Sequence, residues 1–524
     1  MGGGEISNEP NHVRGVKRKH VGDEVRLTFS QRLAAAQKNP KQIEGGSASV
    51  RAEVNSSPKF PDSSDVEDSP KDTQHLEKDD HYRHLYTNEV DFVVLAENDE
   101  KFRACLKDGR HLDFTDPLSV MQLTKSLLKV DFDLHIELPQ DRLCPPVQNR
   151  HNYLLWIKEL LDSSASTYSD TYEPDRKVVG LDIGTGASSI YPLLGCAQRP
   201  AWSFIATDID TKSLSYARNN VEVNRLSSRI RIVQRSVDGS IVPLDDLEIE
   251  SIDFTMTNPP FYASEAELTQ LAKLKSKPPN SACTGAPNEM VCDGGEVGFF
   301  KRIFSESLIL RKRVQWYTTM LGKQSSLQAV VQVFQEHEIE NYAMTELIQG
   351  SKTRRWAVGW SFMSRRPNNK ACRGFEPSAG KKFLPYLTEM VVASRSVHID
   401  SAKQLENVFW TQLEDVTDGL DLVSWNLDED KLRVVGFADE NVWSRAYRRS
   451  KARQSTADEA QEKHGATKLI SECAFGFSIT VKARHDQKAA VSNVDVVVRW
   501  LQGTDYSLFE SFYGMLRNAL LNVI

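Results

Sequence analysis

The chain has 524 residues, of which 40% are hydrophobic and 26% charged, a composition typical of soluble globular proteins. Its formal net charge of −7 excludes a basic surface over the whole chain, so nucleic acid would have to bind at local basic clusters. The seven cysteines form no Cys-x-x-Cys pair, which argues against a disulfide framework and a structural zinc site. No apolar run is long enough to span a bilayer, and we expect an intracellular protein with two folded domains.

The composition divides the chain into four parts. Residues 1–80 are rich in Gly, Ser, Pro, Asp and Lys, which predicts a disordered tail. A folded domain is expected over 81–365, a polar linker over 366–382 and an α+β accessory domain over 383–524. The cluster Lys17-Arg18-Lys19-His20 in the tail is typical of a nuclear localisation signal but equally of a solvated patch, so the nucleus is expected, with the cytoplasm as the alternative.

The first folded domain begins with helical signals. Asp116 followed by Pro117 predicts the N-cap and first position of a helix, whose apolar face includes Leu118 and Met121. A short strand is expected over 131–138, and an amphipathic helix over 154–161.

Two residues stand between that strand and that helix. His151 is expected to make a structural polar contact, because no second metal ligand stands at a suitable spacing. Arg150 immediately precedes a unit that resembles a nucleotide-binding motif.

That unit is a strand, a glycine-rich turn and a helix. A β-branched run over 177–182 ends in Asp182, Gly184 and Gly186 follow, and helical sequence begins at Ser189. Such a turn lets the main chain approach a ligand closely. The third glycine of the dinucleotide fingerprint is missing, with Ser188 in its region, which disfavours a nicotinamide or flavin cofactor.

Three further strands are predicted in the same α/β domain. The strand over 202–207 ends in Asp208, whose carboxylate can accept both hydroxyls of a ribose. The strand over 230–234 is followed by a loop that contains Ser240, and the strand over 252–256 leads into Asn258. Ligands of open α/β sheets bind at these carboxyl ends.

The stretch Asn258-Pro259-Pro260-Phe261 presents an amide, a proline carbonyl and an aromatic ring on a stiff corner. The amide oxygen and the carbonyl can accept both hydrogens of a planar NH₂ group, and the ring can stack on the heterocycle that carries it. The nitrogen lone pair would then be free to attack a methyl sulfonium, by positioning and electrostatic stabilisation and without a metal. A base must leave its stack to reach such a pocket.

Asp-x-Gly-x-Gly, an acidic residue after the second strand and Asn-Pro-Pro-Phe after the fourth together resemble the Rossmann-like S-adenosylmethionine-dependent methyltransferases that modify conjugated NH₂ groups. Within that class, the chain resembles the family of U6 small nuclear RNA adenosine-N6 methyltransferases, which is related to a bacterial ribosomal RNA methyltransferase. The resemblance covers residues 81–365. The motifs that carry it are Phe114-x-Asp116-Pro117, Arg150-x-Asn152-Tyr153, the segment 184–195, Asn258 to Phe261, Gly294-Gly295-Glu296, Lys301-Arg302-Ile303, the segment 316–323 and Arg354-Arg355-Trp356-Ala357.

The resemblance implies a set of site residues. Asn258, Pro259, Pro260 and Phe261 would hold the target adenine. S-adenosylmethionine would contact residues from five segments: Arg150, Asp182, Gly184, Gly186, Ser188, Asp208, Ser240 and Asn258. Asp208 stands where the family usually has Glu, and Ser240 where it usually has Thr; both replacements keep the hydrogen-bonding function.

Structured RNA is the expected partner, and small nuclear RNA in particular. The long stretch over 262–296 predicts a lid or an RNA-contacting element, with an unstructured insertion as the alternative. Basic residues on a predicted helix over 299–313 and before a predicted strand over 356–362 are candidates for the RNA backbone, although a solvated helix face would look the same: Lys301, Arg302, Arg311, Lys312, Arg313, Lys352, Arg354 and Arg355.

Strands are expected in the accessory domain over 383–392, 432–437, 475–481 and 494–501, with a helix over 508–523. A basic loop over 445–453 would bind RNA or dock a protein. For the whole chain we expect an RNA adenine-N6 methyltransferase, and the alternatives are a protein-glutamine methyltransferase and a non-catalytic RNA-binding scaffold.

Overall fold

The computed structural model describes residues 70–267, 285–349, 353–375, 383–455 and 469–521. The predicted nuclear localisation cluster, Lys352 and the middle of the 262–296 stretch lie outside these ranges. All described residues belong to one unit, Ser56–Ile524.

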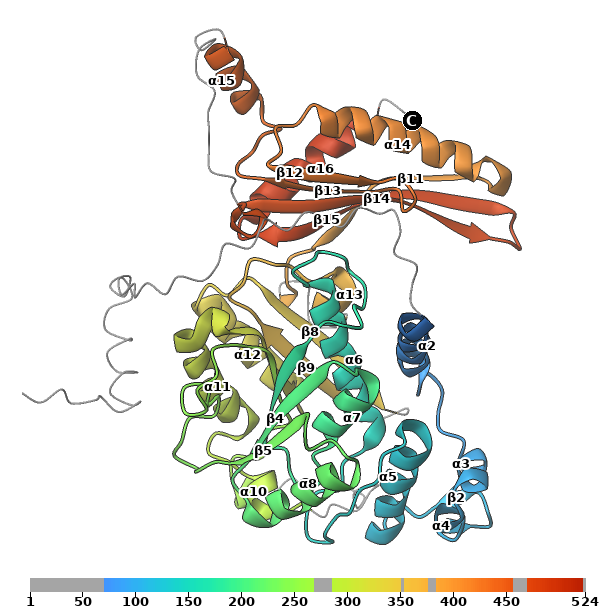
Figure 1. Ribbon diagram of the computed structural model, residues 1–524, viewed down its shortest axis with the longest axis vertical. Coiled ribbons are helices and arrows are strands. Elements are labelled where there is room, and N and C mark those ends of the chain that lie inside the picture. The colour runs from blue at the N-terminus through green and yellow to red at the C-terminus, as the bar shows by residue number, and fades with distance from the viewer. Residues whose placement is uncertain (1–69, 268–284, 350–352, 376–382, 456–468, 522–524) are drawn as a thin grey trace, which may run out of the picture. The chain divides into compact units, whose positions relative to one another are not determined.

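The first folded region is built on an eight-stranded sheet with the order β10-β8-β9-β7-β6-β3-β4-β5 (Figure 1). Most of its neighbouring strands run parallel, and β9 runs antiparallel to both β7 and β8. Its strands are β3 Val178–Ile183, β4 Trp202–Asp208, β5 Ile230–Gln234, β6 Ile252–Thr257, β7 Val314–Leu321, β8 Tyr342–Gln349, β9 Thr353–Trp360 and β10 Arg373–Gly374. The predicted α/β class is confirmed, and β3 to β6 match their expected ranges to within a residue because each is a short, strongly apolar run.

Helices cover both faces of this sheet (Figure 1). The helices are α5 Pro117–Phe132, α6 Val147–Ser163, α7 Ile190–Gln198, α8 Thr211–Val223, α10 Pro287–Met290, α11 Gly295–Leu310, α12 Gln324–Glu336 and α13 Asn369–Cys372, with a 3₁₀ turn at Arg311–Arg313. One buried cluster joins α5, α6 and α7 to the sheet, and a second joins α11 and α12 to the other face. The sheet is therefore buried on both sides, which is the rule for largely parallel sheets.

Asp116 caps α5 as predicted, with its carboxylate accepting the N–H groups of Leu118 and Ser119. Met121 is buried, but Leu118 is 56% exposed, so its assignment to the apolar face was wrong. Helix α6 begins at Val147 and therefore extends well before the predicted range of 154–161.

The strand predicted over 131–138 does not form. Asp131 and Phe132 end α5, Asp133 adopts the left-handed conformation, and residues 134–138 form no strand in the described part of the chain. Two side-chain amides replace the missing ladder: Asn220 bonds to both main-chain groups of Glu137, and Asn224 does the same for His135.

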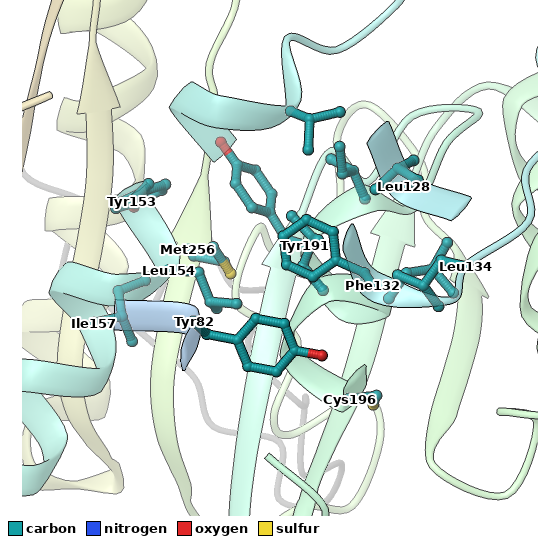
Figure 2. Packing of buried hydrophobic residues seen from close by; sticks show 14 of the residues in the cluster. Tyr82, Leu128, Phe132, Leu134, Tyr153, Leu154, Ile157, Tyr191, Cys196 and Met256 are labelled. Atoms are coloured by element: carbon teal, nitrogen blue, oxygen red, sulfur yellow. The ribbon is translucent and has the colours of Figure 1, made fainter. Parts of the chain in front are cut away.

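Residues 1–69 lie outside the described ranges, and the predicted disordered tail over 1–80 was wrong for its last residues, because helix α2 spans Pro70–His84. It is followed by α3 Phe92–Asn98, α4 Glu100–Arg103, β1 Leu106–Lys107 and β2 His111–Leu112. Figure 2 shows Tyr82 of α2 within the cluster formed by α6 and α7, and its ring stacks on Phe132 with centroids 5.4 Å apart. An aromatic anchor thus attaches a segment whose composition is otherwise polar.

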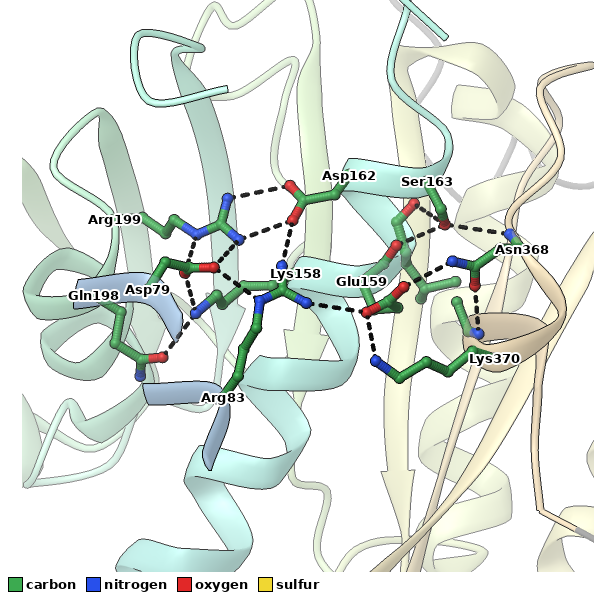
Figure 3. A network of polar contacts seen from close by, with 12 residues as sticks. Asp79, Arg83, Lys158, Glu159, Asp162, Ser163, Gln198, Arg199, Asn368 and Lys370 are labelled. Carbon is green, nitrogen blue, oxygen red and sulfur yellow. Dashed lines mark hydrogen bonds and ion pairs between the residues drawn. The ribbon is translucent and has the colours of Figure 1, made fainter. Parts of the chain in front are cut away.

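Figure 3 shows the polar contacts of the same helix. The carboxylate of Asp79, 2% exposed, contacts the Lys158 ammonium at 2.5 Å and the Arg199 guanidinium at 2.9 Å. Arg199 also bonds to Asp162 at 2.8 Å, and its guanidinium lies 3.5 Å from the centre of the Tyr172 ring. Burial lowers the pKa of Lys158 to about 8. These paired charges tie α2 to α6 and α7.

The second region is an antiparallel sheet with the order β11-β15-β14-β13-β12, against which α14 and α16 pack. Its elements are β11 Glu389–His398, α14 Ala402–Asp418, β12 Ser424–Asp428, β13 Arg433–Ala438, α15 Arg445–Ser455, β14 Phe475–Asp486, β15 Val491–Gly503 and α16 Tyr506–Leu520, with 3₁₀ turns at Ile399–Ser401 and Ile470–Glu472. The α+β class is confirmed.

Several details of this region differ from the predictions. The basic segment over 445–453 lies in a helix, α15, rather than in a loop. Part of the predicted linker over 366–382 is structured, because α13 and β10 lie within it and β10 is an edge strand of the eight-stranded sheet. The strand expected over 383–392 begins later, at Glu389, and the patterns assigned no element to α14 or β12.

Candidate active site

A cavity of about 190 Å³ opens at the carboxyl ends of β3, β4 and β6. It is lined by seven of the predicted cofactor residues, which come from distant segments: Arg150, Gly184, Gly186, Ser188, Asp208, Ser240 and Asn258. The eighth, Asp182, is buried at the end of β3. The topology explains this gathering, because the carboxyl ends of adjacent parallel strands share one edge of the sheet.

The turn after β3 brings main chain to the cavity wall. Gly184 and Gly186 have φ values of 74° and 63°, a left-handed conformation that glycine adopts without strain. The N–H groups of Gly184 and Thr185 both donate to the carbonyl of Thr207 at 2.9 Å. A side chain added at Gly184 would meet open space, so the turn leaves room for a ligand.

Asp208 ends β4 and is fixed by main-chain donors. One carboxylate oxygen accepts the N–H of Gly186 at 2.8 Å, and the other accepts the N–H of Asp210 at 2.9 Å. Burial raises the pKa of this carboxyl group. Each oxygen retains a lone pair, which suits a pair of ribose hydroxyls.

A carboxylate and a guanidinium lie deeper in the site. Asp182 is 1% exposed, neither of its carboxylate oxygens has a hydrogen-bond partner among the described residues, and burial raises its pKa to about 7. Arg150, in the first turns of α6, donates to the Tyr191 hydroxyl at 3.1 Å and contacts the Met320 sulfur at 3.2 Å. A buried carboxyl group without a partner is costly unless a ligand supplies donors.

The Asn258 corner forms another part of the wall. Asn258 and Pro260 line the cavity, whereas Pro259 and Phe261 do not. The side-chain oxygen of Asn258 is buried and accepts no hydrogen bond from the part of the chain that the structure describes. The corner thus offers a free amide acceptor at the cavity edge.

The Phe261 ring lies among groups outside the cavity. The Arg355 guanidinium is 5.3 Å from the ring centre, within the range of a cation–π contact. Burial, followed by the charge of Arg150, lowers the pKa of Arg355.

A short segment over 286–290, including α10, borders the cavity and was not among the predicted site residues. Glu289 accepts the N–H groups of Ala286 at 2.7 Å and of Leu143 at 2.9 Å, and burial raises its pKa. One of its oxygens would lie 3.9 Å from a Cβ placed on Gly186, so it faces the glycine turn. The stretch over 262–296 therefore contributes to the cavity wall, and its role as a lid or RNA contact stays a prediction.

The loop after β5 supplies the opposite wall. Ser240 accepts a hydrogen bond from Arg235 at 3.2 Å and donates to Asp246 at 3.0 Å. Arg302, a predicted RNA contact, donates instead to the Val237 carbonyl at 3.2 Å and lines the cavity.

The remaining basic residues have different environments. Lys301 and Lys312 are exposed, and the Arg311 guanidinium lies 5.0 Å from the centre of the Phe362 ring. Each of the three guanidinium nitrogens of Arg313 donates one hydrogen bond, to Asp245 at 2.6 Å and to two carbonyls at 2.8 Å, and its RNA contact stays a prediction. Arg354 pairs with Glu346 at 3.1 Å.

His151 makes the structural contacts expected of it. Its ring nitrogens lie 2.9 Å from the Tyr82 carbonyl and 3.3 Å from Gln198, and burial lowers its pKa to about 3.

Among the described residues, no cluster of three or more His, Cys, Asp or Glu side chains could hold a metal ion. None of the helices in the described ranges is both long and apolar enough to cross a membrane.

Comparison with known proteins gives consistent matches. A family described as RNA methyltransferase matches residues 74–364. The chain is 34% identical over 416 residues to the Schizosaccharomyces pombe U6 small nuclear RNA (adenine-(43)-N(6))-methyltransferase. The aligned region covers 79% of this chain and 96% of that protein. It is 32% identical over 486 residues to the Danio rerio RNA N(6)-adenosine-methyltransferase mettl16, with 86% and 99% covered. The solved hMettl16 catalytic domain in complex with MAT2A 3′UTR hairpin 1 is 38% identical over 53% of this chain and 94% of that one, with a TM-score of 0.48.

Proposed function

The chain belongs to the RNA methyltransferase family, and on that premise we propose that it methylates the N6 atom of an adenine in RNA. The methyl donor is S-adenosylmethionine. U6 small nuclear RNA is the proposed substrate, because the S. pombe relative, which is matched over 96% of its length, is named for that RNA.

The residues at the cavity fit this cofactor. Asp208 offers two carboxylate oxygens to the ribose hydroxyls, and the glycine turn admits main-chain contact. Arg150 supplies a cation for the carboxylate of the methionine part, and the unpartnered oxygens of Asp182 suit donors. Bound there, the cofactor supplies an electrophilic methyl group on a sulfonium.

The observation that carries the proposal is the buried Asn258 side-chain oxygen, which has no hydrogen-bond partner within the described ranges. With the neighbouring Pro259 carbonyl, it can accept both hydrogens of an adenine N6 group and so draw the lone pair out of conjugation. The corner acts by positioning and by stabilising the positive charge that develops on nitrogen. The surplus proton leaves the nitrogen after the methyl group has been transferred, so no strong base is needed.

Basic groups around the corner favour RNA over a protein glutamine. The Arg355 guanidinium lies on the Phe261 ring, and Lys301 and Lys312 are exposed on α11 and the turn after it. Cations spaced along a surface neutralise backbone phosphates.

The Rossmann-like class is supported by the order and direction of the strands. Activity in the nucleus is supported by Lys17-Arg18-Lys19-His20, and the cytoplasm is the alternative.

The test is methyl transfer from labelled S-adenosylmethionine to a U6 small nuclear RNA transcript, with nucleosides resolved by mass spectrometry after digestion. We expect labelled N6-methyladenosine. Label that enters proteins and not the transcript would favour the protein-glutamine methyltransferase. RNA that binds but acquires no label would favour the scaffold.

A further inference from the structure

The Phe261 ring rests on a glycine in a different part of the chain. A Cβ built on Gly322, in the turn between β7 and α12, would lie 2.7 Å from Cδ1 and 3.0 Å from Cε1 of Phe261. Gly322 does not adopt the left-handed conformation, so the backbone itself does not demand glycine there. The ring and the Glu296 Oε2 atom, which would lie 3.1 Å from that Cβ, together leave no room for a side chain there.

The turn that carries Gly322 is held by one buried carboxylate. Glu296, in the first turn of α11 and 2% exposed, accepts the N–H of Gly322 at 2.6 Å and the N–H of Lys323 at 3.1 Å, one on each oxygen. Hydrogen bonds from main-chain N–H groups to an ionised carboxylate are short and strong. Glu296 therefore sets the position of the surface under the ring.

Gly295, which immediately precedes Glu296, lies against the main chain of residues 261–263. Gly294 and Gly295 have φ values of 70° and 60°, and a Cβ on Gly295 would lie 3.3 Å from both the Phe261 carbonyl oxygen and the Ala263 nitrogen. Tyr262 donates to the Met290 carbonyl at 3.1 Å and accepts from Cys292 at 3.0 Å. The main chain after the Asn258 corner is thus packed directly against the turn that carries Glu296.

We propose that Glu296 and Gly322 are positioning residues, which fix the Phe261 ring in the orientation that receives the target adenine. This inference rests on the proposed function and deepens it. A stacking surface contributes to the rate only if it aligns the base with Asn258, and a displacement of 1 Å can lower turnover about 100-fold. Glu296 acts through the turn and the ring and touches no reacting atom.

The variant Glu296→Gln keeps the size of the side chain but places an amide NH₂ against one of the two N–H donors. We expect kcat on the U6 transcript to fall about 10- to 100-fold, with KM for RNA and the dissociation constant of S-adenosylhomocysteine within twofold of the unaltered protein. The matched variant is Glu306→Gln on the same helix, because Glu306 holds the N–H groups of Ile241 at 2.8 Å and Val242 at 2.7 Å in the same manner. Ile241 lines the cofactor cavity, so Glu306→Gln should weaken S-adenosylhomocysteine binding instead.

A double-mutant cycle with Phe261→Leu separates positioning from general stability. If Glu296 acts through the ring, Glu296→Gln should lower kcat less than twofold in the Phe261→Leu background. Glu306→Gln should weaken S-adenosylhomocysteine binding by the same factor whether or not Phe261 is replaced. Equal losses for Glu296→Gln in both backgrounds would overturn the inference.

Gly322→Ala gives an independent test, should Glu296→Gln not fold. It should lower kcat with Phe261 present and lower it by a smaller factor with Phe261→Ala, which removes both ring carbons near the added methyl group; the Glu296 Oε2 atom, 3.1 Å from that methyl position, is common to both backgrounds. Equal losses of kcat in the two backgrounds would overturn the inference. The unaltered chain is measured in the same assay. Absence of N6-methyladenosine from that sample would refute the proposed function itself, and the inference with it.

Discussion

At the scale of single residues, the site is defined by polar atoms that the protein leaves without partners. The carboxylate of Asp182 and the side-chain oxygen of Asn258 are buried and accept no hydrogen bond within the described chain. Burial of such groups costs free energy, which the fold tolerates where a ligand completes them. Because Asn258 lines the cavity and Asp182 lies at the end of β3 beside it, we propose that a bound ligand donates hydrogen bonds to these two side chains.

Asn258→Ala should abolish methyl transfer, because it removes one of the two acceptors for the N6 hydrogens. We expect a rate loss well above tenfold, that is, more than about 1.4 kcal/mol of barrier, with little change in the free energy of unfolding. Asn441→Ala is the control, since its side-chain oxygen also lacks a partner but lies far along the chain, in the second sheet region. Turnover of Asn258→Ala within tenfold of the unaltered protein would refute the role of the amide.

Asp208→Ala should weaken cofactor binding by removing charge-assisted hydrogen bonds to the ribose. The expected loss is about 1.5–3 kcal/mol, or roughly 10- to 150-fold in the dissociation constant of S-adenosylhomocysteine by titration calorimetry. An unchanged constant would show that the carboxylate at the end of β4 does not hold the ribose.

Asp182 predicts a pH dependence of stability in the cofactor-free protein. Burial raises its folded-state pKa from 3.8 to about 7, so the folded protein retains a proton that the unfolded chain releases at lower pH. The contribution of this group is therefore most favourable at low pH and is lost as the pH rises from about 4 to 7. Asp182→Asn should make Tm depend less on pH between about pH 4 and 7, and it should raise Tm at pH 8. Parallel Tm curves for the two proteins would contradict the buried, unpartnered state of Asp182.

At the scale of elements, helix α2 depends on buried charges rather than on its own sequence. Asp79 stands between Lys158 of α6 and Arg199, which follows α7 (Figure 3). Removal of one partner from such a group leaves the others buried and uncompensated, and this costs more than the pairing itself contributes. The helix is thus attached by long-range contacts, which explains why its polar composition resembled a tail.

Asp79→Ala should lower the free energy of unfolding by about 3–5 kcal/mol in urea titrations, because Lys158 and Arg199 lose their shared carboxylate. Asp80→Ala is the matched control. Its side chain is 69% exposed and forms an ion pair with the exposed His84, so a change within about 0.5 kcal/mol is expected. Similar effects of the two substitutions would show that the buried network does not hold α2.

At the scale of the whole molecule, the two sheet regions share specific contacts. Arg499 and Arg433 both pair with Asp170, and the Arg366 guanidinium lies 4.1 Å from the centre of the Trp500 ring. Since β10 completes the catalytic sheet, a chain cut that spares this sheet falls after Phe375 rather than at residue 365. The domain boundaries and the role of the second region stay predictions.

The basic helix α15 carries the predicted RNA grip of the second region. Arg445, Arg448 and Arg449 are exposed, and replacing all three with Ala in the full-length chain should weaken binding to the U6 transcript. If they bind phosphates, the log–log salt slope should shrink by about 0.7–0.9 for each phosphate that no longer has an arginine beside it. An unchanged slope, measured across a salt series, would favour protein docking as the role of this helix.

The sequence by itself determined the elements whose signals are local. The apolar runs of β3 to β6, the glycine turn at Gly184 and the Asn258 corner are all written in short segments, and strand order then places their ends together. Only the tertiary structure decided the hydrogen bonds between buried carboxylates and main-chain N–H groups that lie far apart in the sequence. The carboxylate of Glu289 meets the Leu143 N–H across 146 positions, and Glu296 meets the Gly322 N–H across 26. Neither contact has a periodic or compositional signature, because a buried carboxylate is placed by the packing of the elements that carry it and its donors.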